Sequence, residues 1–168
     1  YTVQFANYMS PFPNLSYFVE NYTTFKANNV KGLFVQGYAD VPGDFSELRQ
    51  YLLAKLLWDA SIDVKATTAD FLRGFYGKAA SEIENYLKLL SENQKKSKAY
   101  LDIYSGPVQN RTTYLTPEAM NQYDKFLEKA WQAVDEDKTI QKRVEKLRLA
   151  LEYTYFEQAK FYGADAHG

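Results

Sequence analysis

The chain of 168 residues contains no cysteine and a single histidine, His167, one residue from its end. The lack of cysteine excludes disulfide bonds, thiolate metal ligands and a cysteine nucleophile. Without a His/Cys cluster or the ligand spacing of a calcium loop, we expect no metal site and no cofactor. His167 is a poor candidate for catalysis because chain ends are commonly mobile.

An excess of charge of one sign is also missing, as are long apolar runs. Twenty Lys and Arg residues stand against 21 Asp and Glu residues, which gives a net charge of -1. This balance argues against a nucleic-acid partner. No apolar run is long enough to span a bilayer, so we expect no membrane span. The length suits one domain with a sizeable core.

Aromatic residues are abundant instead. They make up 17% of the chain, with 15 Tyr and 11 Phe. Tyrosine-rich surfaces suit contacts with carbohydrate or protein, although most of these rings should lie in the core.

The stretch from Val30 to Trp58 predicts a strand, a loop and a helix. Residues 32–35 form a short apolar run within a predicted strand at 31–35, residues 36–40 form a polar and aromatic turn, and a helix with apolar residues around most of its girth follows. Asp44 and Glu47 have the spacing of a capping box, so Asp44 is expected to cap this helix. Ligands of α/β proteins bind at loops that leave the carboxyl ends of strands, which makes residues 36–44 the first place to look for a site.

The residues before this stretch predict a second strand. Residues 1–6 alternate between apolar and polar types, and apolar side chains from Leu15 to Phe25 then recur at helical spacing, with Asn14 as the expected cap. Residues 2–35 therefore predict a β-α-β unit with parallel strands. Two parallel strands need further strands to bury both faces. We therefore expect the chain to be a piece of a longer polypeptide.

The remainder of the chain predicts helices. Apolar stripes indicate a helix over residues 63–76, which Gly77 should end, and another that includes residues 83–90. Thr116 and Pro117 are typical of a helix start, and two long stripes predict an antiparallel hairpin of helices at 116–136 and 138–162.

Several phrases resemble one family. GLFVQG, ELRQYLLAKLLWD, DFLRGFYGKAA and IENYLKLL, together with ANYMSPFPNL, LTPEAMNQYDKFLEKA and RVEKLRLALEY, resemble the carboxyl-terminal part of the bacterial DUF4838 family, large glycoside-hydrolase-like proteins with a TIM barrel. The resemblance implies an α/β fragment: residues 1–58 would be the last two β/α units of a TIM-type barrel, and residues 59–168 a mostly α-helical C-terminal bundle. Six earlier β/α units would be missing.

Five residues would lie at the rim of such a barrel. Asn7 and Tyr8 follow the first predicted strand, and Gln36, Tyr38 and Asp40 follow the second. Because parallel strands place their carboxyl ends side by side, we expect these residues to bind substrate. Amides hydrogen-bond hydroxyl groups and tyrosine rings offer apolar faces, which suits carbohydrate. An alternative is that the amides only satisfy turn backbone and the rings fill the barrel mouth.

No catalytic residue is predicted. A glycosidase normally needs two carboxylates across the scissile bond. Only Asp40 and Asp44 lie on a predicted strand-exit loop, and Asp44 is expected to be the helix cap. The chain would thus contribute to a sugar site without the catalytic pair.

Three functions remain open at this stage. The first is that the chain is part of a glycoside-hydrolase-like protein that acts on or binds carbohydrate. The second is a non-catalytic carbohydrate-binding or scaffold protein, and the third is an independent helical interaction module. The family resemblance implies a periplasmic or extracellular location. The expected partners are carbohydrate and the remainder of the parent polypeptide.

Overall fold

The computed structural model describes residues 2–37 and 43–162, and these residues form a helical fold. The elements, in chain order, are η1 (Leu15–Tyr17), α1 (Phe18–Ala27), α2 (Ser46–Trp58), α3 (Val64–Tyr76), η2 (Gly77–Ala79), α4 (Ala80–Ser97), α5 (Pro117–Gln132) and α6 (Lys138–Tyr162).

The predicted α/β barrel fragment is wrong, because the described ranges contain helices but no strand. The two predicted strands are extended segments that share a single backbone hydrogen bond, from Thr2 N to Gln36 O at 3.0 Å. One bond does not make a ladder, and two parallel segments cannot cover both faces of a sheet. On its other side the first segment bonds to a loop, through Phe5 N and Ile103 O at 2.6 Å.

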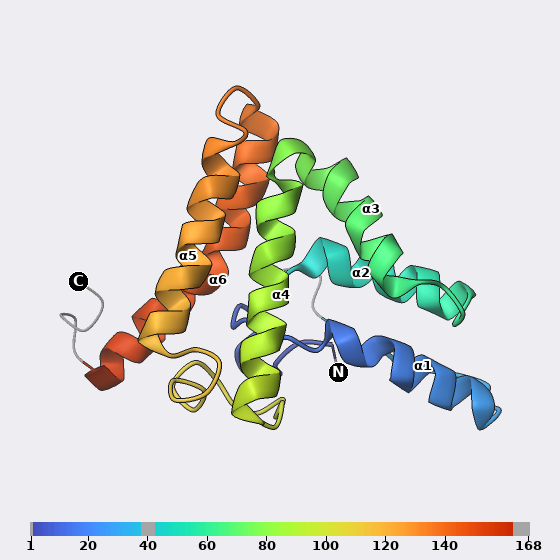
Figure 1. Cartoon of the computed structure of the whole chain (residues 1–168). Coiled ribbons are helices and arrows are strands. Elements are labelled where there is room, and N and C mark those ends of the chain that lie inside the picture. The colour runs from blue at the N-terminus through green and yellow to red at the C-terminus, as the bar shows by residue number, and fades with distance from the viewer. Residues whose placement is uncertain (1, 38–42, 163–168) are drawn as a thin grey trace.

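Helix α4 occupies the middle of the fold (Figure 1). It packs against α5 on one side and α3 on the other, while α5 also packs against α6, and α2 against α3 and α1. One continuous cluster of buried side chains runs from Phe18 through Leu52 and Tyr86 to Leu151. The core therefore crosses residue 58, and the division of the chain at that position stays a prediction.

Local sequence signals account for several helix ends. Asp63 accepts a hydrogen bond from Ala66 N at 3.0 Å and caps α3. Gly77, which ends α3, has φ of +52°, a backbone conformation that costs glycine little. Thr116 caps α5 by accepting from Ala119 N at 3.2 Å, and Pro117 follows in the first turn. The signals at Gly77 and at Thr116 and Pro117 were read correctly from the sequence, whereas Asp63 was predicted as the first residue of its helix and not as its cap.

Helices α5 and α6 correspond to the two segments at which the sequence predicted a hairpin. They lie side by side and are joined by the short turn at the tip of the molecule (Figure 1). Arg148 of α6 links them through ion pairs to Asp124 at 3.0 Å and Glu128 at 2.8 Å. The acidic segment 135–137 is exposed on this turn.

Two tyrosines at the centre of the core differ in their hydrogen bonding. Tyr86 and Tyr123 are both fully buried, and their ring centroids lie 5.4 Å apart. The Tyr123 hydroxyl donates to Tyr114 O and accepts from Asn93 Nδ2, both at 2.8 Å. The Tyr86 hydroxyl has no partner. Burial raises the pKa of Tyr123 to about 12 and that of Tyr86 well above its ordinary value, so both stay protonated at neutral pH.

This difference predicts opposite results for the same substitution. Tyr123→Phe should lower the free energy of unfolding by about 1–3 kcal/mol, because it leaves the buried Tyr114 carbonyl and the half-buried Asn93 amide without this partner. Tyr86→Phe should be neutral or stabilising, because it removes a buried hydroxyl that makes no hydrogen bond. Urea unfolding followed by circular dichroism measures both. Equal losses for the two variants would contradict the assignment.

Candidate functional site

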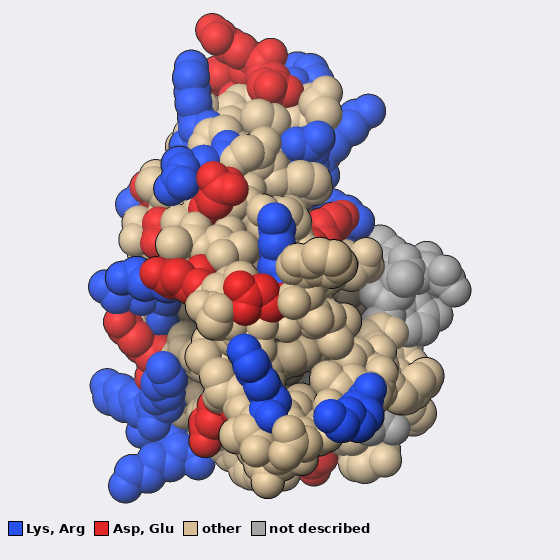
Figure 2. Space-filling view, turned by 90° about the vertical axis from the view of Figure 1, so that its right-hand side faces the viewer, with Lys and Arg blue, Asp and Glu red and all other residues tan. Residues whose placement is uncertain are grey.

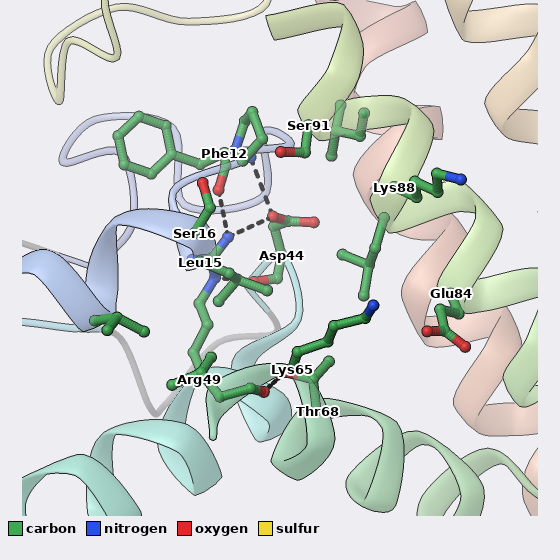
Figure 3. Close-up of a pocket in the computed structure, with 15 residues that line it drawn as sticks. Phe12, Leu15, Ser16, Asp44, Arg49, Lys65, Thr68, Glu84, Lys88 and Ser91 are labelled. Carbon is green, nitrogen blue, oxygen red and sulfur yellow. Dashed lines mark hydrogen bonds and ion pairs between the residues drawn. The ribbon is translucent and has the colours of Figure 1, made fainter. Parts of the chain in front are cut away.

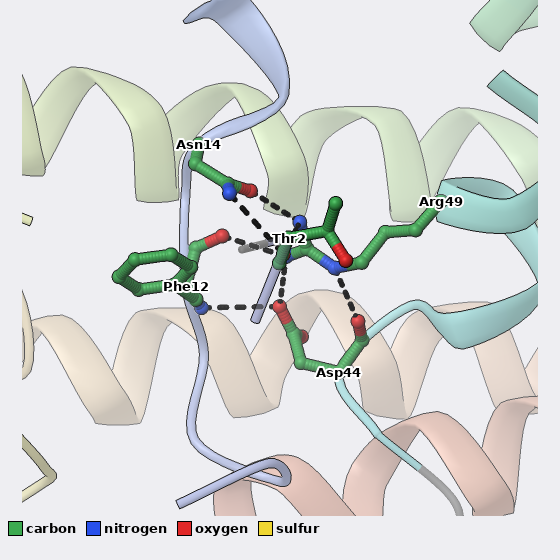
Figure 4. A network of polar contacts seen from close by, with 5 residues as sticks. All are labelled: Thr2, Phe12, Asn14, Asp44 and Arg49. Carbon is green, nitrogen blue, oxygen red and sulfur yellow. Dashed lines mark hydrogen bonds and ion pairs between the residues drawn. The ribbon is translucent and has the colours of Figure 1, made fainter. Parts of the chain in front are cut away.

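Arg49, on the buried face of α2, uses all five of its N–H groups: three donate to the amino-terminal segment and two to Asp44 (Figure 4). Nε donates to Asp44 O at 2.7 Å, Nη1 to Thr2 O at 2.9 Å and to Asn14 Oδ1, and Nη2 to Phe12 O at 2.6 Å and to Asp44 Oδ2 at 2.8 Å. One side chain thereby fixes residues 2–14 against α2.

Asp44 is the ionic partner of Arg49 and does not cap α2 as predicted. The two side chains are only 3% and 1% exposed, so the ion pair is buried. Oδ2 of Asp44 also accepts from Phe12 N at 3.1 Å, whereas the residue before the helix is Phe45, which makes no side-chain cap. The predicted capping box is therefore wrong: a long-range partner outcompetes the local one. Asn14, the other expected cap, likewise bonds Thr2 O and Arg49 instead of a helix N–H.

The sequence held a signal for Arg49 that its interpretation missed. The buried apolar residues of α2 are Leu48, Leu52 and Leu56, which recur at helical spacing. Arg49 lies on this same face, next to Leu48 and three residues before Leu52. A cation inside an apolar stripe must find an anion or carbonyl oxygens, because burying an unpaired charge is very costly. Two carboxylates precede it closely in the sequence, Glu47 and Asp44, and in the structure Asp44 is the one that pairs with Arg49.

A pocket of about 390 Å³ lies beside this ion pair, between the η1 segment, α3 and α4 (Figure 3). Its walls are mostly apolar, and include Leu15, Val19, Val64 and Leu87. Asp44 and Arg49 contribute to its inner end. The second carboxylate oxygen of Asp44, Oδ1, is buried and makes no hydrogen bond with any residue that the structure describes.

The residues predicted to bind substrate are not gathered around this pocket. Asn7 and Tyr8 are half-buried in the amino-terminal segment, and Gln36 is half-buried in the extended segment paired with Thr2. Tyr38 and Asp40 lie outside the described residues. The barrel rim that was to bring the five together is absent from the described ranges. Their role in binding sugar stays a prediction.

The Asn7 side chain joins the amino-terminal segment to two distant elements. Its Nδ2 donates to Ser105 O at 3.0 Å, and its Oδ1 accepts from the Tyr153 hydroxyl at 2.6 Å. Gly106 makes room for it, since a Cβ there would lie 2.7 Å from Asn7 Nδ2. Asn7 therefore holds a loop against α6.

Two exposed aromatic rings lie near Asn7: Phe5 is two residues before it, and Tyr104 precedes Ser105, its hydrogen-bond partner. Phe5 and Tyr104 pack edge to face, with ring centroids 5.8 Å apart. They are 38% and 66% exposed, respectively. Together with Asn7 they form what we call the aromatic surface of the 98–110 loop.

The charged groups of the described residues offer little else of chemical interest. No cluster of three or more His, Asp or Glu side chains that could hold a metal occurs in the ranges described. Lys and Arg are interspersed with Asp and Glu along one side of the molecule, beside a broad area with few charged residues (Figure 2). Burial would raise the pKa of Glu47, but hydrogen bonds from Lys146 and Ser46 outweigh it and lower that pKa.

None of the helices in the described part of the chain combines the length and apolar character needed to cross a membrane. This finding fits the prediction made from the sequence.

Comparisons with known proteins give one family. No curated protein and no solved structure matches the chain. The family described as Domain of unknown function (DUF4838) matches residues 1–88, which is more than half of the 168 residues. This match covers the amino-terminal segment, the Arg49–Asp44 ion pair and most of the pocket wall. The predicted family is thus confirmed, while its glycoside-hydrolase-like character stays a prediction: the chain belongs to the DUF4838 family.

Proposed function

We propose that this chain is a non-catalytic docking domain of a carbohydrate-binding protein, and that it joins the remainder of that polypeptide through the extended segment 31–37. The observation that carries the proposal is that residues 31–35 of this segment are largely exposed and that their backbone has no hydrogen-bond partner within the described ranges. Leu33 is 40% exposed and Phe34 is 93% exposed. No hydrogen bond within the described ranges reaches the backbone of residues 31–35.

A groove beside this segment provides room for apolar side chains. It has a volume of about 340 Å³ and lies between the extended segments and α2. Val35, Leu53 and Leu57 line it, and Leu57 is 54% exposed. Exposed apolar area of this kind is a feature of interaction surfaces.

An extended polypeptide strand is the occupant that fits both features. Its backbone would hydrogen-bond the unpaired groups of residues 31–35, and its alternate side chains would enter the groove. The segment from Gly32 to Gly37 carries no charge, so a neutral, apolar strand is complementary to it. A strand of the same polypeptide is favoured over a separate molecule because covalent linkage gives it a high effective concentration.

Hydrogen exchange tests this docking. In the 168-residue chain the amides of residues 31–35 should exchange at nearly unprotected rates, because they lack hydrogen bonds. In the polypeptide expressed from the complete gene they should be at least about tenfold slower. Phe34→Lys should abolish this protection, whereas Phe156→Lys, at a site 69% exposed on α6, should not. Unprotected amides in the complete polypeptide would contradict the proposal.

Carbohydrate is the ligand class that we propose for the aromatic surface of the 98–110 loop. Aromatic faces pack against the C–H surface of sugars, and Tyr104 and Phe5 are exposed there. The Asn7 amide beside them has two N–H donors, of which one bonds Ser105 O. A sugar hydroxyl could accept from the second. This placement retains Asn7 from the predicted set.

Titration with a panel of oligosaccharides, followed by saturation-transfer NMR, tests the aromatic surface. A bound oligosaccharide should lose about fivefold or more in affinity on Tyr104→Ala, which corresponds to about 1 kcal/mol of lost ring contact. Phe156→Ala is the control, because this ring is also exposed but lies on α6. If no oligosaccharide binds, or if both variants bind equally well, the aromatic surface is not a sugar site.

A further inference from the structure

We infer that the pocket between η1, α3 and α4 binds a small apolar molecule that carries one hydroxyl group, and that this hydroxyl donates a hydrogen bond to Oδ1 of Asp44. The inference is independent of the docking and of the carbohydrate surface proposed above. It rests on the pocket walls, on an unpartnered buried oxygen and on the charges around both.

The size and walls of the pocket suit an apolar molecule. Its volume of about 390 Å³ lies within the range of ligand sites. An apolar cavity of about 150 Å³ can hold benzene, so two fused rings fit here. Leu15, Val19, Val64 and Leu87 line the space.

Asp44 supplies a hydrogen-bond acceptor at the inner end of this space. Its Oδ2 is bonded to Arg49 and to Phe12 N, whereas Oδ1 makes no hydrogen bond. Figure 3 shows Oδ1 on the side of the carboxylate that faces α4, away from Arg49. Leaving a buried acceptor unsatisfied is costly, and more so when it carries charge. A ligand donor that reaches Oδ1 would remove that cost.

The surrounding charges favour a neutral donor. Arg49 already balances the charge of Asp44 at 2.8 Å. Lys65, Lys88 and Glu84 also line the pocket, and Lys88 pairs with Glu92 at 3.9 Å. A ligand ammonium would therefore meet the two lysines without a carboxylate that lacks a cation at the inner end, whereas a hydroxyl carries no charge to be balanced.

The apolar walls separate this ligand class from sugars. A monosaccharide has hydroxyl groups around its whole ring, and most of them would face Leu15, Val64 and Leu87 without a partner. Each buried hydroxyl without a hydrogen bond is unfavourable. A molecule with one hydroxyl at its inner end gives up only the hydrogen bonds between that hydroxyl and water, and it gains a hydrogen bond to Asp44 in exchange.

A matched pair of probes tests the inference on the unaltered chain. β-Naphthol and its methyl ether share the same rings, and only the former can donate a hydrogen bond. β-Naphthol should shift the amide NMR signals of Leu15, Thr68 and Leu87, which line the pocket, and bind at least about tenfold more tightly than the ether. Equal affinities for the two probes, or no shifts at these residues, would overturn the inference.

Two serine variants of α4 then locate the site. Ser91 lines the pocket, whereas Ser81 is exposed in the first turn of the same helix. Ser91→Phe should fill the space and lower the affinity for β-naphthol at least about tenfold, and Ser81→Phe should leave it unchanged. Undiminished binding to a folded Ser91→Phe chain would place the probe elsewhere and overturn the inference.

Discussion

The buried ion pair between Arg49 and Asp44 is the interaction on which the amino-terminal half of the fold depends. Removing two charges from water is expensive, and the cost is offset only where every donor is satisfied. Arg49 meets this condition with five hydrogen bonds, three of them to main-chain oxygens. Residues 2–14 form no helix or strand, so this network substitutes for the ladder that they lack.

The same ion pair relates the three surfaces to which we assign functions. Arg49 of this pair binds Thr2 O, and the Thr2 amide donates to Gln36 O and thereby positions segment 31–37. It lies at the inner end of the pocket and leaves Oδ1 of Asp44 available. The amino-terminal segment also positions the aromatic surface, because Phe5 and Asn7 donate hydrogen bonds to the 98–110 loop. Helices α4, α5 and α6 pack against one another in the order α4–α5–α6 and form the rest of the core.

Prediction from sequence succeeded where the determining contacts are local. Thr116 and Gly77 act within one helical turn of their own positions, so their residue types identified the helix ends. It failed for Asp44, which was predicted to cap the following helix but instead accepts hydrogen bonds from Phe12 N and Arg49. The strands failed for a related reason: alternation of apolar residues indicates an extended segment, but a sheet requires partners from elsewhere. The Arg49 network joins residues as far as 47 positions apart, which no local pattern reveals.

The most direct measurement is the free energy of unfolding of Arg49→Met, Asp44→Asn and the double variant. Each single substitution should cost about 3–5 kcal/mol because it leaves a buried charge unpaired, and the double variant should cost clearly less than their sum. Arg148→Met is the control: its ion pairs are partly exposed, so about 1 kcal/mol or less is expected. A loss below about 1 kcal/mol for Arg49→Met, or strict additivity, would contradict the central role of this ion pair.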